Sequence, residues 1–179
     1  MRHIELFEEY DISNFKDIEG KFLKIYYSIT NQPFKNKIII LPVPEIYRHT
    51  NQSSAAMSRK IIFSKNKIWI REMPEYQIFY ELSHEIGHTL KPNLEHRSLD
   101  AEEVKATLFQ YCFVKAVKKL KMDIPDFERF VDYRIDHINR TNPKYSQYHN
   151  IARGIAMNCD YNFDAGVKNI VDRLKSIGR

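Results

Sequence analysis

Residues 79–90, FYELSHEIGHTL, constrain the fold more than any other stretch of the chain. The apolar residues in and just before it recur at intervals of three and four, the period of an α-helix that buries one face. Met73-Pro74 precedes the stretch and Lys91-Pro92 ends it, so the pattern predicts a helix over 75–90. The side chains that would anchor this helix to a core are Ile78, Phe79, Leu82 and Ile86. Gly87 would leave room for another element to approach closely.

Two histidines flank a glutamate on this helix. Each helical residue advances by about 100°, so His84 and His88 lie one turn apart and their imidazoles can converge on one metal ion. Glu85 is next to His84, on the side where its carboxylate can take a proton from a metal-activated water. Catalytic zinc normally has three protein ligands and an open fourth position, so a third ligand is required.

Four residues downstream are candidates for this third ligand: Glu95, His96, Glu102 and Glu103. Glu103 lies fifteen positions beyond His88 (103 minus 88), on the next predicted helix, which can pack beside the first and aim a carboxylate at the two imidazoles. The metzincin pattern HExxHxxGxxH is disfavoured, because positions 91 and 94 are Lys and Leu. His96 could still line the cleft, although a solvent-exposed loop histidine is the simpler reading.

The periodicity elsewhere predicts a mainly helical chain with a small sheet before the histidine-bearing helix. Further helices are expected over 14–29, over 100–121 with Asp100 as N-cap, over 125–139, and over 150–177 in one or two pieces with 160–163 as an interruption. A buried strand is expected in KIIILPVP (37–44), between Pro33 and Pro42, and a hairpin from the runs 61–63 and 68–70. The segments 45–54 and 141–147 are expected to be a loop and a turn-rich link.

The chain of 179 residues is within the usual single-domain range, so we expect one domain over 1–179. Its 43% hydrophobic and 28% charged residues are typical of a folded soluble protein. No apolar run approaches the length of a membrane span, and the charged start lacks the core of a signal peptide. Cys112 and Cys159 stand alone in helix-like stretches, which indicates no disulfide framework. We therefore expect a cytoplasmic protein with no membrane partner.

The formal net charge is +5, and basic residues gather around Lys115, Lys118, Lys119 and Lys121. Such a cluster could mark a nucleic-acid surface. Basic and aromatic residues do not alternate there, and no known DNA-reading module accompanies the charge, so a solvated helix face is favoured. Nucleic acid is possible as a partner but not favoured, and the sequence carries no indication of oligomeric state.

HEIGH followed by AEEVKATLF resembles the gluzincin arrangement, in which a helix with HExxH is followed by one with Glu-x-x-Ala. The resemblance implies that zinc is bound by His84, His88 and Glu103, with Ala106 at the alanine position and Glu85 as general base. Within the gluzincins the chain is most similar to compact ImmA/IrrE-type proteases and to the zincin-like domain of ArdC-type antirestriction proteins. The matching stretches are IWIREMPEYQIFYELSHEIGH and AEEVKA, and the specific similarity covers about residues 60–115.

The chain departs from these families in two ways. Four residues after the ligand Glu they often carry Asp or Asn, which can orient a zinc-binding histidine, whereas this chain has Thr107. That contact is therefore expected to be weaker or to come from another residue. The chain also has no N-terminal region long enough for the single-stranded-DNA-binding domain of ArdC-type proteins, which lowers the expectation of DNA binding.

The resemblance implies an α+β, zincin-like fold and a zinc-dependent peptidase that hydrolyses an intracellular protein or peptide. In this mechanism Glu85 accepts the proton of the attacking water and returns it to the leaving amine. Oxyanion donors could come from the last third of the chain, where His137, Tyr145, Tyr148 and His149 lie. The alternative is a non-catalytic or DNA-associated module on a zincin scaffold, of the antirestriction or mobile-element type. A third reading treats HEIGH as coincidence in a structural helical protein.

Overall fold

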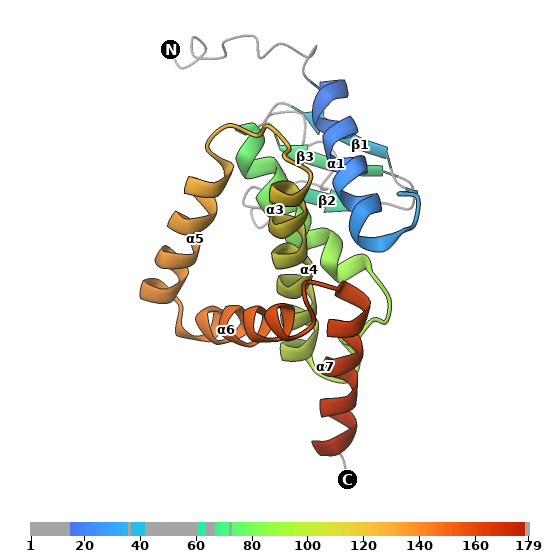
Figure 1. Ribbon diagram of the computed structural model, residues 1–179, viewed down its shortest axis with the longest axis vertical. Helices are drawn as coiled ribbons and strands as arrows, with labels where there is room; N and C mark the ends of the chain where they lie inside the picture. Colours follow the sequence, from blue (N-terminus) through green and yellow to red (C-terminus); the bar gives the residue numbers. More distant parts are fainter. Residues whose placement is uncertain (1–14, 36, 42–60, 64–66, 72, 178–179) are drawn as a thin grey trace, which may run out of the picture.

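The computed structural model of the protein describes residues 15–35, 37–41, 61–63, 67–71 and 73–177 (Figure 1). The described chain is mainly helical. Its helices are α1 (Phe15–Thr30), α3 (Glu75–Thr89), α4 (Leu99–Lys119), α5 (Phe127–Thr141), α6 (Pro143–Asn158) and α7 (Phe163–Ile177). Its strands are β1 (Lys37–Leu41), β2 (Ile61–Phe63) and β3 (Lys67–Arg71). Among the described residues, no helix combines the length and apolar character that crossing a membrane requires.

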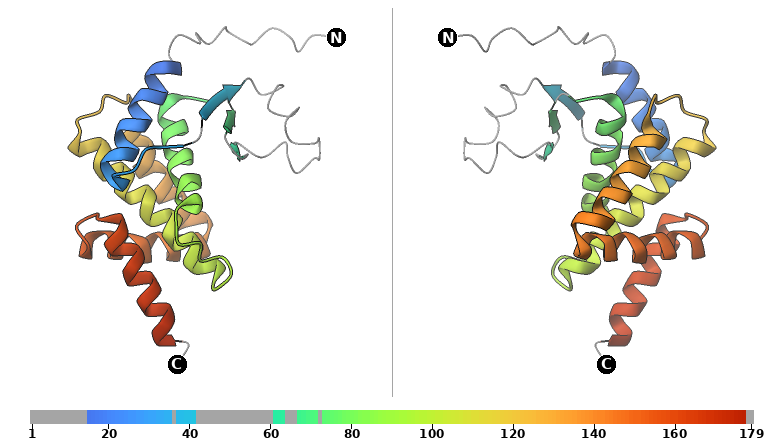
Figure 2. Two further views of the ribbon diagram at one scale, coloured as in Figure 1. Left: turned by 90° about the vertical axis from the view of Figure 1, so that its right-hand side faces the viewer. Right: turned by 90° about the vertical axis from the view of Figure 1, so that its left-hand side faces the viewer.

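The three strands form one small sheet in the order β1-β3-β2. β3 is parallel to β1, with Ile38 opposite Ile68, and antiparallel to β2, with Phe63 opposite Ile68. Ile38, Ile68 and Ile70 are buried, since at most 1% of each is exposed. The sheet lies at one end of the helices, beside α1 and the start of α3 (Figures 1 and 2). The predicted pairing of 61–63 with 68–70 is confirmed.

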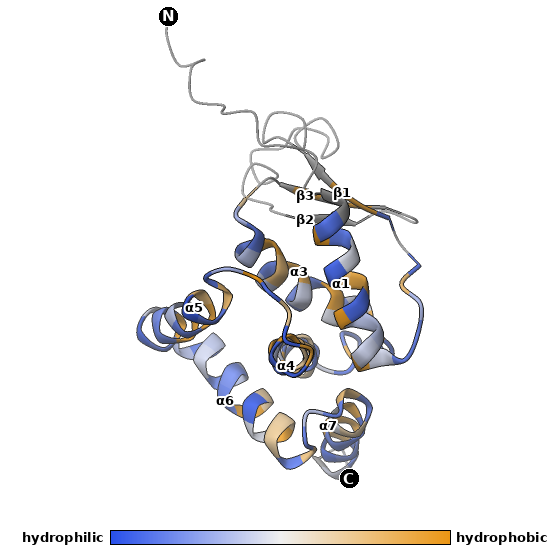
Figure 3. Ribbon diagram, turned by 45° about the horizontal axis from the view of Figure 1, so that its top comes forward, coloured by the Kyte–Doolittle hydropathy of each residue, from blue (hydrophilic) through white to orange (hydrophobic). Residues whose placement is uncertain are grey.

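α4 is the central helix of the molecule. Figure 3 looks nearly along its axis, with the other helices arranged around it. α1, α3, α6 and α7 pack directly against α4, and α5 packs against α3 and α6. A helix surrounded in this way must be apolar on most of its sides. Its buried apolar residues include Val104, Leu108, Phe109, Cys112, Phe113, Ala116 and Val117.

Aromatic rings join α1, α3 and α4. Phe113 of α4 lies between Phe22 of α1, at 5.6 Å between ring centroids, and Phe79 of α3, at 6.1 Å. All three rings are fully buried. Aromatic pairs at these separations add stabilisation to the area they bury. The face of α3 that carries Phe79 is therefore held firmly, and the opposite face is left for polar side chains.

Two sequence predictions about helix ends are wrong. Asp100 is not the N-cap of α4, because the helix begins at Leu99 and the Ser98 hydroxyl accepts the hydrogen bond from Ala101 N. Asp100 lies in the first turn, where it accepts a hydrogen bond from the Tyr148 hydroxyl. Residues 141–147 are not a turn-rich link: α6 begins at Pro143, and Asn142 caps it. Proline is favoured at the first position of a helix, so the Asn-Pro pair starts a helix here.

The predicted bounds of α1, α3, α4 and α5 agree with the structure to within about two residues, whereas the helix predicted from residue 150 begins seven residues earlier, at Pro143. The predicted interruption near 160–163 separates α6 from α7, and Asp160 and Tyr161 have positive φ angles of 49° and 56°. The predicted loop 45–54, the end of the predicted strand beyond Leu41 and the hairpin turn lie outside the described residues.

Candidate metal centre

Helix α3 has an apolar face and a polar face. Ile78, Phe79, Leu82 and Ile86 are each at most 2% exposed, as the sequence pattern predicted. His84, Glu85 and His88 are half-buried on the remaining part of the helix surface. The apolar face fixes the rotation of the helix, and this rotation turns the polar residues toward α4.

Gly87 sets the distance between the two helices. A Cβ atom at this position would lie 2.6 Å from Ala106 Cα and 2.8 Å from Ala106 O, closer than atoms can pack. Only a glycine therefore permits α3 to approach the backbone of α4 here, as the sequence analysis anticipated. Because Ala106 is one helical turn from Glu103, this close approach brings Glu103 within reach of the histidines.

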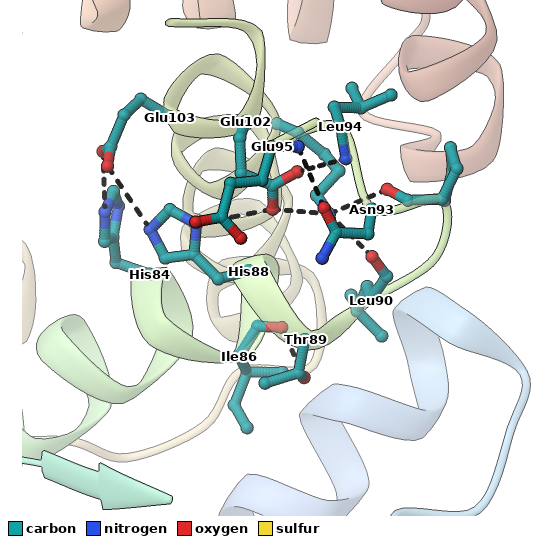
Figure 4. Close-up of polar contacts among 12 residues, drawn as sticks. His84, Ile86, His88, Thr89, Leu90, Asn93, Leu94, Glu95, Glu102 and Glu103 are labelled. Carbon is teal, nitrogen blue, oxygen red and sulfur yellow. Dashed lines mark hydrogen bonds and ion pairs between the residues drawn. The ribbon is translucent and has the colours of Figure 1, made fainter. Parts of the chain in front are cut away.

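Three side chains converge between α3 and α4 (Figure 4). His84 Nε2 lies 3.4 Å from Glu103 Oε2, and His88 Nε2 lies 3.7 Å from Glu103 Oε1. One ligand atom from each of the three residues falls within 4.8 Å of the others, and in the described part of the chain this is the group that could hold a metal ion. The structure thus brings together the three residues that the sequence analysis named.

The spacing and polarity of these atoms fit a small divalent cation. Ligand atoms about 2.0–2.2 Å from a common tetrahedral zinc lie roughly 3.3–3.5 Å apart. The 3.4 Å and 3.7 Å distances from Glu103 to the two histidines are close to this, and the three ligand atoms together lie within 4.8 Å of one another. Glu103 Oε2 is buried, and His84 Nε2 at 3.4 Å approaches it without the geometry of a good hydrogen bond, which is costly unless another group neutralises it. The adjacent His84 imidazole lowers the pKa of Glu103 although burial opposes this, so the carboxylate is ionised, as a metal ligand must be.

Solvent can reach the three ligands. The exposed fractions of the His84, His88 and Glu103 side chains are 18%, 28% and 27%. A cavity of about 220 Å³ opens beside His88, lined also by Asn93, Glu95, Leu99, Glu102 and Glu103. Structural zinc sites are usually closed by four protein ligands, whereas catalytic sites keep a position open. A metal ion held by these three accessible residues would therefore keep an open coordination position beside the cavity.

Glu102 makes a contact that the sequence analysis missed. It was considered only as a third ligand, but its Oε1 lies 3.4 Å from His88 Nδ1, the ring nitrogen that faces away from Glu103 (Figure 4). Thr107, where related families often carry Asp or Asn, is fully buried, and its hydroxyl has no hydrogen-bond partner among the described residues. Among these residues it is therefore Glu102, one residue before Glu103, whose carboxylate lies against a ring nitrogen of His88.

The other third-ligand candidates lie outside the group. Glu95 and His96 are exposed in the connection between α3 and α4, and neither belongs to the cluster of possible metal ligands. Glu95 lines the cavity.

The candidate oxyanion donors have different surroundings. Tyr148 donates a hydrogen bond to Asp100, and the His137 ring stacks on Tyr133. His149 is buried, and its Nδ1 lies 3.2 Å from the Tyr111 hydroxyl. Burial, followed by the influence of His84 and Arg134, lowers the pKa of His149 to about 4, which keeps this ring neutral at pH 7.

Tyr145 differs from these three. It is 38% exposed on α6. Its pKa is raised first by burial and then by electrostatic interactions with Glu103, Tyr148 and Glu85. The phenol is thus influenced electrostatically by Glu85 and Glu103, and it keeps its proton at neutral pH.

In comparisons with known proteins, no family model, no curated protein and no solved structure matches this chain.

Proposed function

We propose that this protein is a zinc-dependent peptidase of the gluzincin type, with a zincin-like fold. The observation that carries the proposal is the convergence of His84, His88 and Glu103 on one accessible point, with Glu85 beside His84 on the same helix. The order of elements supports it, because a small sheet precedes the HExxH helix and the next helix supplies the third ligand. Two imidazoles and one carboxylate are a common ligand set for catalytic zinc.

A zinc ion bound here would polarise a substrate carbonyl and make water acidic enough to lose a proton near neutral pH. Glu85 is the residue proposed to accept that proton and to return it to the leaving amine. Glu85 is half-buried, follows His84 directly on α3, and is not part of the group of possible metal ligands. Tyr145 is the proposed hydrogen-bond donor to the developing oxyanion, because its partly exposed phenol on α6 keeps its proton and is influenced by the charges of Glu103 and Glu85.

A protein or peptide is the proposed substrate. The cavity beside His88 can receive a side chain next to the scissile bond. The strand β2 lies at an edge of the sheet, where an extended peptide could add by backbone hydrogen bonds.

The test is cleavage of a peptide library made from a proteome digest, read by mass spectrometry with zinc-loaded protein. Wild-type protein should cleave a subset of the peptides, and Glu85→Gln should bind zinc equally well but cleave none. Tyr145→Phe should lower kcat more than it changes KM, because the oxyanion develops only in the transition state. Normal cleavage by Glu85→Gln would remove this residue from the mechanism, and no cleavage by wild-type protein would contradict the assignment as a peptidase.

A further inference from the structure

The carboxylate of Glu102 contacts His88, one of the proposed metal ligands. We propose that Glu102 is a positioning residue that holds His88 in its metal-binding orientation and tautomer. The inference rests on the proposed metal site. His88 presents its two ring nitrogens to two neighbouring carboxylates: Nε2 lies 3.7 Å from Glu103 Oε1, and Nδ1 lies 3.4 Å from Glu102 Oε1. A neutral imidazole that binds a metal through Nε2 carries its proton on Nδ1, and a carboxylate facing that nitrogen selects this tautomer.

Glu102 is itself fixed from two directions. Its Oε2 accepts a hydrogen bond of 2.7 Å from Leu94 N, and its Oε1 lies 2.7 Å from Lys105 Nζ. Only 6% of the residue is exposed, so water does not compete for these contacts. The carboxylate therefore reaches His88 from a rigid support, as an orienting group must.

Lys105 connects this support to the end of α3. The residue is fully buried, and its ammonium group donates hydrogen bonds to Leu90 O at 2.6 Å and to Pro92 O at 2.9 Å. With Glu102 as the third neighbour, each of its three N–H donors has an oxygen within reach. Glu102 and Lys105 thus tie α4 to the chain that leaves α3 just after His88.

The burial of this pair needs an explanation, because two charges in a protein interior lose their hydration. A pair of apolar residues of similar size often stabilises a fold as well or better. The contact with His88 provides the explanation: an immobile carboxylate makes the histidine a stronger and better-aligned ligand. Stability alone gives no reason for Glu102 to point at a ligand ring.

The test measures zinc affinity, by competition with a chromophoric chelator, separately from the stability of the metal-free protein. Glu102→Gln should weaken zinc binding by roughly 10–100-fold, the usual effect of losing such a partner. Glu95→Gln is the matched control, since it removes the same charge from the lining of the same cavity but lies outside the ligand group. The control should change zinc affinity by less than about threefold, because an exposed charge acts weakly at a distance.

A double variant separates positioning from folding. Glu102→Leu with Lys105→Met replaces the buried pair by apolar side chains. The melting temperature of this metal-free double variant should be at least as high as that of the metal-free wild type. Zinc affinity should stay at least tenfold below that of wild type, because nothing then orients His88. Cobalt-substituted protein provides an independent readout, and its visible spectrum should differ between wild type and the double variant.

The outcomes separate the two proposals. If wild-type protein binds zinc and Glu102→Gln binds it equally well, or if the double variant recovers full affinity, Glu102 has no positioning role while the metal site stands. If wild-type protein binds no zinc, the metal site fails and this inference fails with it.

Discussion

At residue 87 the side chain is a single hydrogen atom, and the separation of α3 and α4 depends on it. A Cβ atom there would meet the backbone of Ala106 at 2.6 Å and 2.8 Å, and backbone cannot move aside as a flexible side chain can. The two helices would have to separate, and the three ligands come from both of them.

Gly87→Ala is therefore expected to lower the free energy of unfolding by about 2 kcal/mol, in the range for overpacked cores. Zinc affinity should fall as well, because Glu103 moves with Ala106. Gly154→Ala is the matched control: this glycine lies within α6 with no neighbouring atom within 4 Å of an added Cβ, so the change should stabilise by about 0.5–1 kcal/mol. Urea denaturation of the metal-free variants measures both effects. Equal stability of the Gly87→Ala variant and wild type would contradict the packing described.

His149 gives the metal-free protein a definite dependence on pH. Its pKa in the folded state is about 4, because burial disfavours the charged ring, whereas an exposed histidine titrates near 6.5. Between these values the unfolded chain binds more protons than the folded protein, so the free energy of unfolding rises with pH. The contribution of His149 is complete above pH 6.5 and is lost as the pH falls to about 4, up to roughly 3 kcal/mol in all.

The measurement is urea denaturation at pH 4 to 7 with a chelator present, for wild type and for His149→Gln. The variant lacks the titrating ring, so its stability should fall less steeply over this range. Parallel curves for the two proteins would show that His149 does not carry this dependence.

The residues at the site could be predicted from the sequence to different extents. His84, Glu85 and His88 share one helix, so their geometry follows from the helical repeat alone. Glu103 needed the resemblance to a known arrangement, because no local rule states how two successive helices cross. The role of Glu102 could not be predicted: it depends on where the backbone of Leu90, Pro92 and Leu94 passes after α3 ends.

At the scale of single elements, local signals located most helices but not all of their ends. Ser98 and Asp100 are both residues that favour an N-cap, and they stand two positions apart. Ser98 is selected because its backbone is extended, with φ of −166°, and its hydroxyl reaches Ala101 N. At 142 and 143, Asn-Pro is equally typical of a turn and of a helix start, and only the packing of α6 against α4 and α5 distinguishes them.

Removing the N-cap should destabilise the first turns of α4, where Glu102 and Glu103 lie. Ser98→Ala is expected to lower the free energy of unfolding by about 1 kcal/mol, the usual contribution of an N-cap serine. Ser176→Ala is the control, since that hydroxyl, near the end of α7, only donates to Arg173 O of the same helix, and its loss should change stability by less than about 0.5 kcal/mol. Thermal unfolding followed by circular dichroism compares the stabilities of the two variants. Equal losses of stability in Ser98→Ala and Ser176→Ala would contradict the role of Ser98 as N-cap.

At the scale of the whole molecule, the candidate metal centre is a product of the fold. The residues proposed as its ligands come from α3 and α4, which meet because α3 buries one face and α4 is buried on most sides. The mainly helical character and the sheet ahead of α3 could be predicted, because each depends on local periodicity. The arrangement of α1, α5, α6 and α7 around α4 could not, because it depends on contacts between residues far apart in the chain.

The central claim is that α3 and α4 together bind one zinc ion. The most direct measurement is zinc bound per chain after equilibrium dialysis, for wild type, Glu103→Ala and Glu95→Ala. Wild type and Glu95→Ala should each retain about one zinc ion per chain, as expected for a single three-ligand site, while Glu103→Ala should retain almost none. Zinc retained in full by Glu103→Ala, or absent from wild type, would contradict the account.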